Sequence, residues 1–458
     1  MTERTTTPLV VSLSNHGGSK IRPLVVRVTP FDKLRVNGKS KTQNDTSESY
    51  CKKTNHSIKY RDGAHIKGKE QKMDFQLTED QKMLKKMVHD LAEKEFRPKA
   101  AEWEAGAEHI PPEYVKKLAD LGLLGLCLPV EYGGQGRSAF EAILAIEELA
   151  RVSCLCASPV FESNVGPVKV IEQFGTEKQK QKYIPPVCTG ESMISVGMTE
   201  PEAGSALTDL TTRAVLKGDH YVVNGMKRFI TGGGESDVYV VYVRLSEQKG
   251  AKGIGGLIIE KGMPGFTFGK QEQFMGMRGF PSCDLIFEDC RVPKENLVVK
   301  EGDFRKLMTA FDLERCGNST MCLGIAQGAL EEAVAYSQHR KQWGKEICEF
   351  QAVQFMLAEM AMKVEAARLL IYRATSNAAT GLPVPLEANL AKCFANQMVR
   401  EVTGMALQIH GGYGYSKEYP VERMMRDGWG WGVAGGTIEI QRITIASLLL
   451  DRRFDQRR

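Results

Sequence analysis

Three absences limit what this chain can be. No stretch of about 18 consecutive apolar residues occurs, so the sequence predicts no membrane-spanning helix. The 11 cysteines contain no C-x-x-C pair, since the nearest neighbours are Cys154/Cys156 and Cys316/Cys322, and this argues against a zinc knuckle or a dithiol redox site. We interpret the cysteines as reduced core thiols in a cytosol-like compartment, and we expect no metal site.

The body of the chain also lacks the basic charge that nucleic-acid binding requires. Residues 1–72 hold 15 Lys and Arg against 6 Asp and Glu, whereas residues 73–458 hold 46 against 50. The body is therefore mildly acidic, and we expect no nucleic-acid partner. Residues 1–72 sustain no helical or strand period, and we interpret them as a disordered or spurious leader before a start at Met73. A transit peptide is the alternative, although such peptides contain few acidic residues.

Hydrophobic periodicity divides the rest of the chain into three blocks. Residues 73–190 read as an α-helical domain, residues 191–300 as a compact β domain, and residues 301–458 as a second helical domain. Thr78 and Gln81 fit a capping box at the first helix start, and Pro98 is expected to end that helix. One helical pattern runs through Val168–Tyr183. Strands are expected at Asp219–Gly225, Asp237–Leu245, Gly255–Glu260, Gly265–Phe268 and Cys283–Glu288. The order helix, strand, helix differs from the alternating pattern of a doubly wound nucleotide-binding fold and predicts an α+β protein.

Eight segments, read together, resemble the acyl-CoA dehydrogenase family. They occur in family order between about Met73 and Asp451, whereas residues 1–72 lie outside the resemblance. The segments are Pro129–Gly134 (PVEYGG), Met198–Ser205 (MTEPEAGS), Lys227–Gly233 (KRFITGG), Met275–Gly279 (MGMRG), Arg340–Lys345 (RKQWGK), Gln408–Gly414 (QIHGGYG), Tyr419–Arg423 (YPVER) and Gly436–Arg442 (GTIEIQR).

The resemblance implies a fold, a cofactor and partners. The fold would have an N-terminal helical domain, a middle β-barrel-like domain and a C-terminal four-helix bundle. The cofactor would be FAD, the substrate an acyl-CoA, the electron acceptor an electron-transferring flavoprotein, and the assembly a homotetramer. A bacterial-type cytoplasmic enzyme is expected ahead of a mitochondrial matrix one. The expected cofactor-binding residues are Met198, Thr199, Ser205, Phe229, Thr231, Arg340, Gln342, Trp343, Gln408, Gly412, Thr437 and Glu439.

The chemistry of these residues agrees with flavin binding. Thr199 and Ser205 lie on a loop of small residues whose hydroxyls suit the polar edge of a flavin, and an ordinary hydroxyl-stabilised turn is the alternative. Phe229 replaces the Trp that is usual in the family and keeps an aromatic plane. By the resemblance, Arg340 binds the FAD pyrophosphate of a neighbouring subunit, a task that suits a planar guanidinium. Gly412 permits close approach of a phosphate to the backbone.

One segment matches the sequence pattern of a dinucleotide-binding site. Residues Gly430–Gly435 read GWGVAG, which is literally G-x-G-x-x-G. A dinucleotide-binding fingerprint must follow a strand and open a helix, whereas this segment follows the helical pattern of Val421–Asp427. We therefore do not expect a nicotinamide cofactor.

The catalytic base departs from the common family pattern. Most members carry a Glu in a Y-E-G-T segment, and the spacing from Gln408 places that position at Gly435. A minority, the isovaleryl- and long-chain-type enzymes, carry the base in a D-x-E-R segment on the helix that opens the C-terminal domain. Here that segment is Asp312–Arg315, which makes Glu314 the expected base. The alternative is that Glu314 is a helix-surface partner of a neighbouring charge.

The expected reaction is α,β-dehydrogenation of an acyl-CoA thioester to the trans-2-enoyl-CoA. Glu314 would take the α-proton, the β-hydrogen would leave as hydride to flavin N5, and a backbone N–H at Gly435 with a flavin ribityl hydroxyl would stabilise the enolate oxygen. Glu162 is a second acid near the expected acyl pocket, and we interpret it as a surface residue or a member of a buried pair. The expected substrate-binding residues are Ser205, Phe311, Asp312, Arg315 and Gly435.

Two other functions fit the same family. An acyl-CoA oxidase would use dioxygen, but such enzymes usually carry a further C-terminal helical domain, and this sequence ends soon after the dehydrogenase-like core. A family member that has lost its base could serve as an assembly factor, and Glu314 argues against that. The small residues of Gly428–Gly436 hint at a branched or cyclic acyl group.

Overall fold

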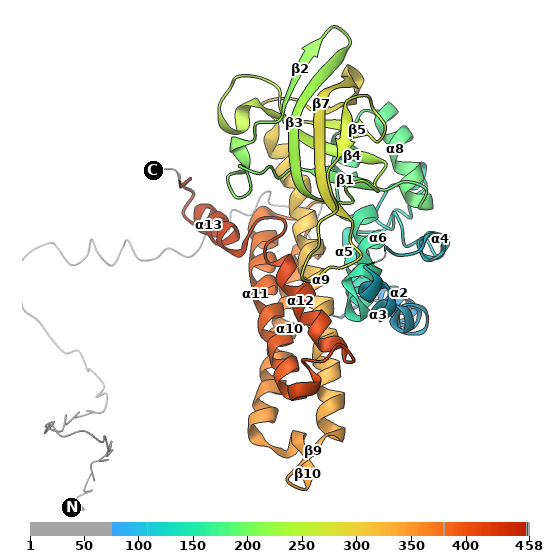
Figure 1. The fold of residues 1–458 in the computed structure, drawn as a ribbon, viewed down its shortest axis with the longest axis vertical. Helices are drawn as coiled ribbons and strands as arrows, with labels where there is room; N and C mark the ends of the chain where they lie inside the picture. Colours follow the sequence, from blue (N-terminus) through green and yellow to red (C-terminus); the bar gives the residue numbers. More distant parts are fainter. Residues whose placement is uncertain (1–75, 108, 379–380, 455, 457–458) are drawn as a thin grey trace, which may run out of the picture. The chain divides into compact units, whose positions relative to one another are not determined.

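The computed structural model describes residues 76–107, 109–378, 381–454 and 456. All of them fall in the unit Phe75–Arg458, so the expectation of a leader over residues 1–72 lies outside the described residues. Helices, then a sheet, then long helices follow one another along this unit (Figure 1).

The first block is helical. Thr78 caps the first helix and forms the expected capping box with Gln81. A π-helical turn, Ala92–Phe96, joins the first two helices. The helices are α2 (Glu79–Leu91), α3 (Arg97–Gly106), α4 (Pro112–Asp120), α5 (Ala139–Val152), α6 (Cys154–Asn164), α7 (Val168–Phe174) and α8 (Glu177–Thr189).

Two boundaries in this block differ from the sequence-based expectation. Pro98 does not end a helix, because it stands in the first turn of α3, where its missing N–H costs no hydrogen bond. The helical pattern across 168–183 is two helices, since Gly175 is extended and Thr176 caps α8 through the Gln179 N–H.

The middle block is one eight-stranded mixed sheet in the order β6-β7-β3-β2-β4-β5-β8, with β1 parallel to β4. Three of its strands (β1, β2 and β8) were not anticipated, and each is short. The strands are β1 (Ile194–Gly197), β2 (Arg213–Lys217), β3 (His220–Thr231), β4 (Val238–Arg244), β5 (Ile254–Glu260), β6 (Phe266–Phe268), β7 (Ser282–Pro293) and β8 (Leu297–Val299).

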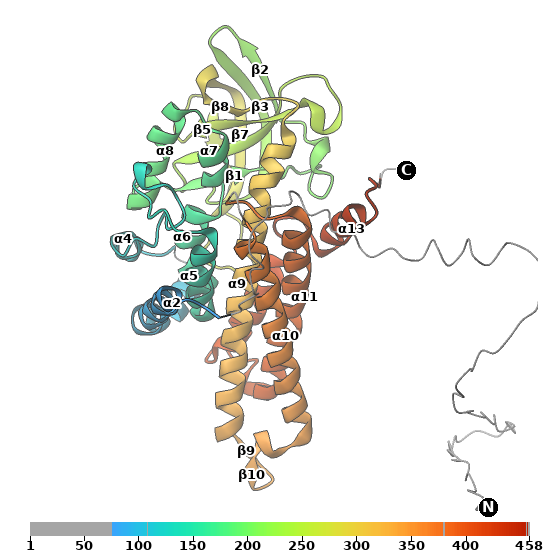
Figure 2. The same cartoon turned by 180° about the vertical axis from the view of Figure 1, so that it is seen from behind.

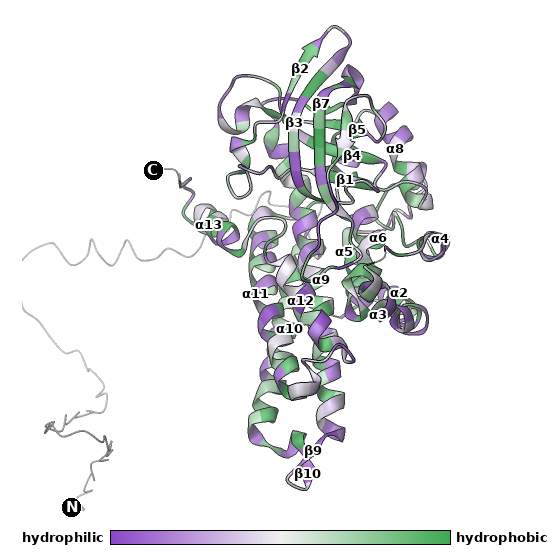
Figure 3. Ribbon diagram, in the orientation of Figure 1, coloured by the Kyte–Doolittle hydropathy of each residue, from purple (hydrophilic) through white to green (hydrophobic). Residues whose placement is uncertain are grey.

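Strand β4 is apolar on both faces because both faces are covered. Tyr239 and Val241 join an apolar cluster with residues of β3, β5 and β7, so the sheet curves around a core of its own, as expected for a barrel-like domain. Val240 and Tyr242 point the other way, into a cluster that includes α7, α8 and the start of the next helix. Figure 3 shows the resulting hydrophobic stretches on β4 and β5.

The last block is the expected helical bundle. Its helices are α9 (Phe304–His339), α10 (Gln351–Ser376), α11 (Pro385–His410), α12 (Pro420–Trp431) and α13 (Ile438–Leu449). Helices α9 to α12 pack against one another, and the short hairpin β9 (Lys341–Gln342) and β10 (Lys345–Glu346) lies at the end of the bundle away from the sheet (Figures 1 and 2).

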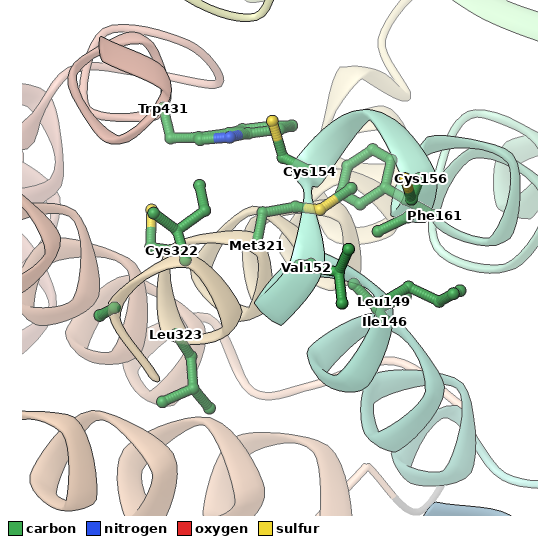
Figure 4. Close-up of a cluster of buried hydrophobic side chains, with 14 of the residues drawn as sticks. Ile146, Leu149, Val152, Cys154, Cys156, Phe161, Met321, Cys322, Leu323 and Trp431 are labelled. Carbon is green, nitrogen blue, oxygen red and sulfur yellow. The ribbon is translucent and has the colours of Figure 1, made fainter. Parts of the chain in front are cut away.

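The first and last blocks share one core. Figure 4 shows Met321 of α9 extending toward Val152 of α5 and Phe161 of α6, and these residues belong to one buried cluster with Ile146, Leu149 and Leu323. On α9, Gly317 admits a neighbouring side chain, because an added Cβ would lie 2.7 Å from the Phe161 ring of α6. The helix that carries the expected base is therefore fixed between the N-terminal helices and the bundle.

Candidate active site

Glu314 lies on α9 without a polar partner. Its neighbours Asp312 and Arg315 pair with each other at 2.5 Å across one helical turn. Within the described residues, the Glu314 carboxylate forms neither a hydrogen bond nor an ion pair, so it is not the helix-surface partner considered above. The residue as a whole is partly accessible to solvent, whereas its carboxyl group is buried.

Glu162, on α6, is the second acid of the site. It was interpreted above as a surface residue or a member of a buried pair, and the structure shows it half-buried. The residue is not exposed, it has no hydrogen-bond or ion-pair partner in the described part of the chain, and its charge acts directly on Glu314. Burial alone raises the pKa of Glu162 to about 8, because a carboxylate is less stable away from water.

The surroundings of Glu314 favour its protonated form. Burial raises the pKa of Glu314 well above its usual value, the charge of Glu162 raises it further, and Arg315 and Lys392 oppose both effects. From the sheet, Tyr242 of β4 also interacts with Glu314; burial first, and then this carboxylate, raise the pKa of the tyrosine. The site thus lies where α6, β4, α9 and α11 meet.

Gly435 faces the same region from the loop between α12 and α13. Its φ is +68°, a conformation that glycine adopts without strain and other residues adopt at a cost. An added Cβ would lie 3.7 Å from the Phe311 ring and 3.6 Å from the Asn318 amide nitrogen. These two residues stand one turn before and one turn after Glu314 on α9. Gly435 and Glu314 therefore approach one region from two elements.

The segment Gly430–Gly435 is not a dinucleotide fingerprint. It begins inside α12, which follows no strand, and ends in the loop before α13. Its carbonyl groups point to the helices around it: Asn318 donates to Trp431 at 3.4 Å and Lys392 donates to Ala434 at 2.9 Å.

The expected substrate-binding residues fall into two places. Phe311, Asp312, Arg315 and Gly435 gather around Glu314. The Arg315 guanidinium lies 5.0 Å from the Phe311 ring centre, and its Nε is buried without a hydrogen-bond partner. Ser205 is exposed on the loop that follows β1, and no contact joins it to that group.

The expected flavin residues of the sheet form an open face. A β-bulge between Lys227 and Ile230 turns Phe229 into a left-handed conformation with φ +58°. This leaves Phe229 51% exposed, with the Arg228 guanidinium 4.6 Å from its ring centre. An exposed aromatic ring beside the polar Thr231 suits a planar, partly polar ligand.

The loop that carries Met198, Thr199 and Ser205 is held by a buried ion pair. Lys227 of β3 is fully buried and contacts Glu200 at 2.7 Å. Burial alone would raise the pKa of the Glu200 carboxyl, but Lys227 and hydrogen bonds from Thr211 and Thr212 lower it to about 2. The hydroxyls of Thr199 and Ser205 form no hydrogen bond with the described residues, which differs from the hydroxyl-stabilised turn considered above and leaves both free for a ligand.

The remaining expected cofactor residues lie elsewhere. One group is at the far end of the bundle, beside β9 and β10 (Figures 1 and 2), where the Arg340 guanidinium lies 5.4 Å from the Tyr413 ring centre. It consists of Arg340, Gln342, Trp343, Gln408 and Gly412. A second group is at the start of α13, where Thr437 caps the helix and Glu439 is exposed. One chain does not bring Phe229 and Arg340 together.

Sequence reasoning missed several polar residues of the site. Lys392 and Asn396 of α11, Asn318 of α9 and Gln441 of α13 are all buried. A single lysine in a helical pattern normally indicates a solvated face, and the periodicity of α11 gave no sign that this one points inward. Among the described residues, no cluster of three or more His, Cys, Asp or Glu could hold a metal ion. No helix of the described residues is long and apolar enough to span a membrane.

Three family models cover the described chain in order. They are the N-terminal domain of acyl-CoA dehydrogenase over residues 78–191, the middle domain over 195–290 and the C-terminal domain over 304–450.

Relatives and solved structures agree with these matches. The short-chain-specific acyl-CoA dehydrogenase of Clostridium acetobutylicum is 43% identical over 82% of this chain and 99% of its own length. The caffeyl-CoA reductase-Etf complex subunit CarC of Acetobacterium woodii is 39% identical, over 82% of this chain and 99% of its own length. The structure of butyryl-CoA dehydrogenase from Megasphaera elsdenii superposes with a TM-score of 0.80 at 40% identity, over 82% of this chain and 100% of that one. This chain therefore belongs to the acyl-CoA dehydrogenase family of FAD-dependent oxidoreductases.

Proposed function

We propose that this enzyme converts an acyl-CoA thioester to the trans-2-enoyl-CoA, with Glu314 as the base that removes the α-proton. The observation that carries the proposal is the position of Glu314. Its carboxylate is enclosed and unpaired, and it stands across from Gly435, the position at which most of the family carry their base. The alternative of a non-catalytic member loses its main support, because the D-x-E-R position carries a carboxylate that has no partner among the described residues.

The surroundings of Glu314 suit proton transfer. A thioester α-proton is weakly acidic, and a base works best when its pKa approaches that of the proton it removes. Burial and Glu162 raise the pKa of Glu314 in that direction. As the α C–H bond breaks, its proton goes to a Glu314 oxygen and its electron pair forms the enolate.

The residues of the sheet fit FAD. Phe229 offers an exposed ring, and the hydroxyls of Thr199, Ser205 and Thr231 are available for its polar edge. Bound FAD supplies the acceptor of the β-hydrogen, which leaves with its electron pair. Phe311, Arg315 and the Gly435 backbone would hold the thioester end of the substrate, and Ser205 would meet the CoA portion.

Assembly and electron transfer form a further part of the proposal. Arg340 stands between α9 and β9, at the end of the bundle away from the sheet that carries Phe229 (Figure 1). We therefore assign Arg340, together with Gln408, to the FAD of a neighbouring subunit in a homotetramer. We place the enzyme in the cytoplasm, with an electron-transferring flavoprotein as the acceptor. The named Etf complex of a relative supports this partner.

The substrate is expected to carry an uncharged acyl group. Glu162 and Glu314 both line the site without an ion-pair partner, and a terminal carboxylate on the acyl chain would oppose the ionisation that Glu314 needs in order to accept a proton. Gly428, Gly430 and Gly432 are packed closely against neighbouring side chains, so any room for a branched or cyclic acyl group would have to come from Gly435.

Anaerobic titration tests this proposal. The purified holoenzyme is mixed with straight-chain, branched, cyclic and dicarboxylic acyl-CoA thioesters, and flavin bleaching is followed. Bleaching by at least one uncharged thioester, and slower bleaching by the dicarboxylic ones, is expected. A flavin that no acyl-CoA bleaches would refute the proposal. Rapid reoxidation of the reduced enzyme by dioxygen would favour the oxidase alternative.

A further inference from the structure

Lys392 is a charged residue in a place where charge is costly. It lies on α11 and is fully buried, and burial lowers the pKa of its ammonium to about 7. A methionine of similar length would fill this space without that cost. Packing alone therefore does not explain why a lysine, with its polar ammonium group, occupies this position.

The side chain of Lys392 ends on the loop that carries Gly435. Its Nζ donates to the Ala434 carbonyl oxygen at 2.9 Å and to the Asn396 Oδ1 at 2.9 Å. Asn396 in turn donates to Asn318 Oδ1 at 2.9 Å. On the other side, Gln441 donates to the Gly436 carbonyl at 3.1 Å. Side chains of α9, α11 and α13 thus hold the carbonyl groups of this loop.

The bond to Ala434 fixes the direction of one backbone N–H. The peptide between Ala434 and Gly435 is trans, so its carbonyl and its N–H point to opposite sides of a rigid plane. Because the carbonyl points at Lys392, the Gly435 N–H points away from it. That N–H has no acceptor among the residues that the structure describes, although its neighbours Val433 and Ala434 both donate to the Gly430 carbonyl.

We infer that Lys392 is a positioning residue that aims the Gly435 N–H at the thioester carbonyl oxygen of the substrate. The inference rests on the proposed function, because the N–H stabilises the enolate oxygen that forms when Glu314 takes the α-proton. An oxyanion donor is effective when it is held in place before the reaction. A glycine loop is flexible by itself, and Lys392 supplies the rigidity.

The test measures the stretching frequency of the substrate carbonyl rather than the turnover rate. Holoenzyme is mixed with an enoyl-CoA labelled with carbon-13 at the thioester carbonyl, and its C=O stretch is recorded by isotope-edited infrared difference spectroscopy. A hydrogen bond lowers this frequency. The wild type should show a clear downshift, Lys392→Met should lose most of it, and Glu314→Gln should keep it. Removal of an oxyanion donor lowers kcat about 10²–10³-fold, and Lys392→Met should lower kcat at least about 10-fold with little change in KM.

Two variants guard against a general loss of structure. Lys169→Met removes another buried lysine, on α7, which pairs with Glu172 at 3.0 Å and donates to the Cys127 carbonyl at 3.5 Å, and it should leave the carbonyl frequency unchanged. If Lys392→Met does not fold, Lys392→Gln keeps a shorter neutral donor and should give an intermediate downshift.

The inference fails if Lys392→Met, or Lys392→Gln in its place, retains the full wild-type downshift. It also fails if the wild type shows no downshift. A wild-type flavin that no acyl-CoA reduces would instead count against the proposed function, and the carbonyl measurement is independent of that result because the enoyl-CoA is already the product.

Discussion

The carboxyl groups of Glu162, on α6, and Glu314, on α9, interact within one enclosed site, and neither has a hydrogen-bond or ion-pair partner in the described chain. Two such groups do not ionise independently, because the first negative charge opposes the second.

Glu162→Gln should move the acidic limb of the activity profile to lower pH. Glu314 must be ionised to accept a proton, so kcat/KM rises with pH through its ionisation. The charge of Glu162 raises the pKa of Glu314, and its removal lets Glu314 ionise at lower pH. The measurement is flavin reduction against pH, with the exposed Glu131→Gln as a control. An unmoved limb would show that Glu162 does not act on the base.

Glu162→Gln should also change how stability depends on pH. In the folded protein Glu162 keeps its proton up to a pKa of about 8, whereas its usual value is 4.5. Between these values unfolding releases a proton, so the free energy of unfolding falls as pH rises. The variant lacks this contribution. The difference in Tm, variant minus wild type, should therefore be larger at about pH 8 than at about pH 5. Equal differences at the two pH values would contradict this.

Lys227→Met should destabilise the sheet and release flavin. It leaves the Glu200 carboxylate buried without its cation, and breaking a buried pair on one side costs about 3–5 kcal/mol. The double variant Lys227→Met/Glu200→Gln removes the orphaned charge and should recover part of the loss. Denaturant unfolding and flavin content measure both effects. A single variant as stable as the wild type would show that the pair does not hold the loop.

Arg340→Met should lower flavin occupancy while the chain stays folded. Arg340 lies at the end of the bundle away from Phe229 (Figure 2), so its loss affects FAD only if a second chain brings it there. Arg305→Met, at the opposite end of α9, is the matched control and should keep its flavin. Absorbance and analytical ultracentrifugation give occupancy and mass together. A wild-type monomer with full flavin content would contradict the assembly proposed here.

The architecture could be predicted well from the sequence because hydrophobic periodicity is a local signal that recurs many times along each element. Helical periods mark α5, α9, α10 and α11, and a continuous run of valine and tyrosine marks β4, so small errors at single residues did not matter. The errors occurred at positions where a single residue determines whether a helix continues or ends. Pro98 is compatible with either the end or the first turn of a helix, and only packing selects the second. Gly175 interrupts a continuous helical pattern for a reason that periodicity cannot show.

The candidate site could be predicted only where its chemistry lies within one segment. Glu314 could be proposed as the base from the sequence because the D-x-E-R segment is contiguous. The proximity of Glu314 to Glu162 could not be predicted. It depends on the close contact between α6 and α9 at Gly317, which is a feature of the tertiary structure. Lys392 was missed for the same reason, because its partner Ala434 is distant in sequence.

The central claim is that Glu314 removes the α-proton, and single-turnover flavin reduction in Glu314→Gln tests it most directly. Gln has nearly the same shape but cannot accept the proton, and general-base catalysis contributes about 10²–10⁴-fold. The anaerobic rate of flavin bleaching should therefore fall by at least about 10²-fold, while bound FAD, folding and the affinity for enoyl-CoA stay near wild type. Bleaching at a near-normal rate would contradict the account and make Glu162 the next candidate for the base.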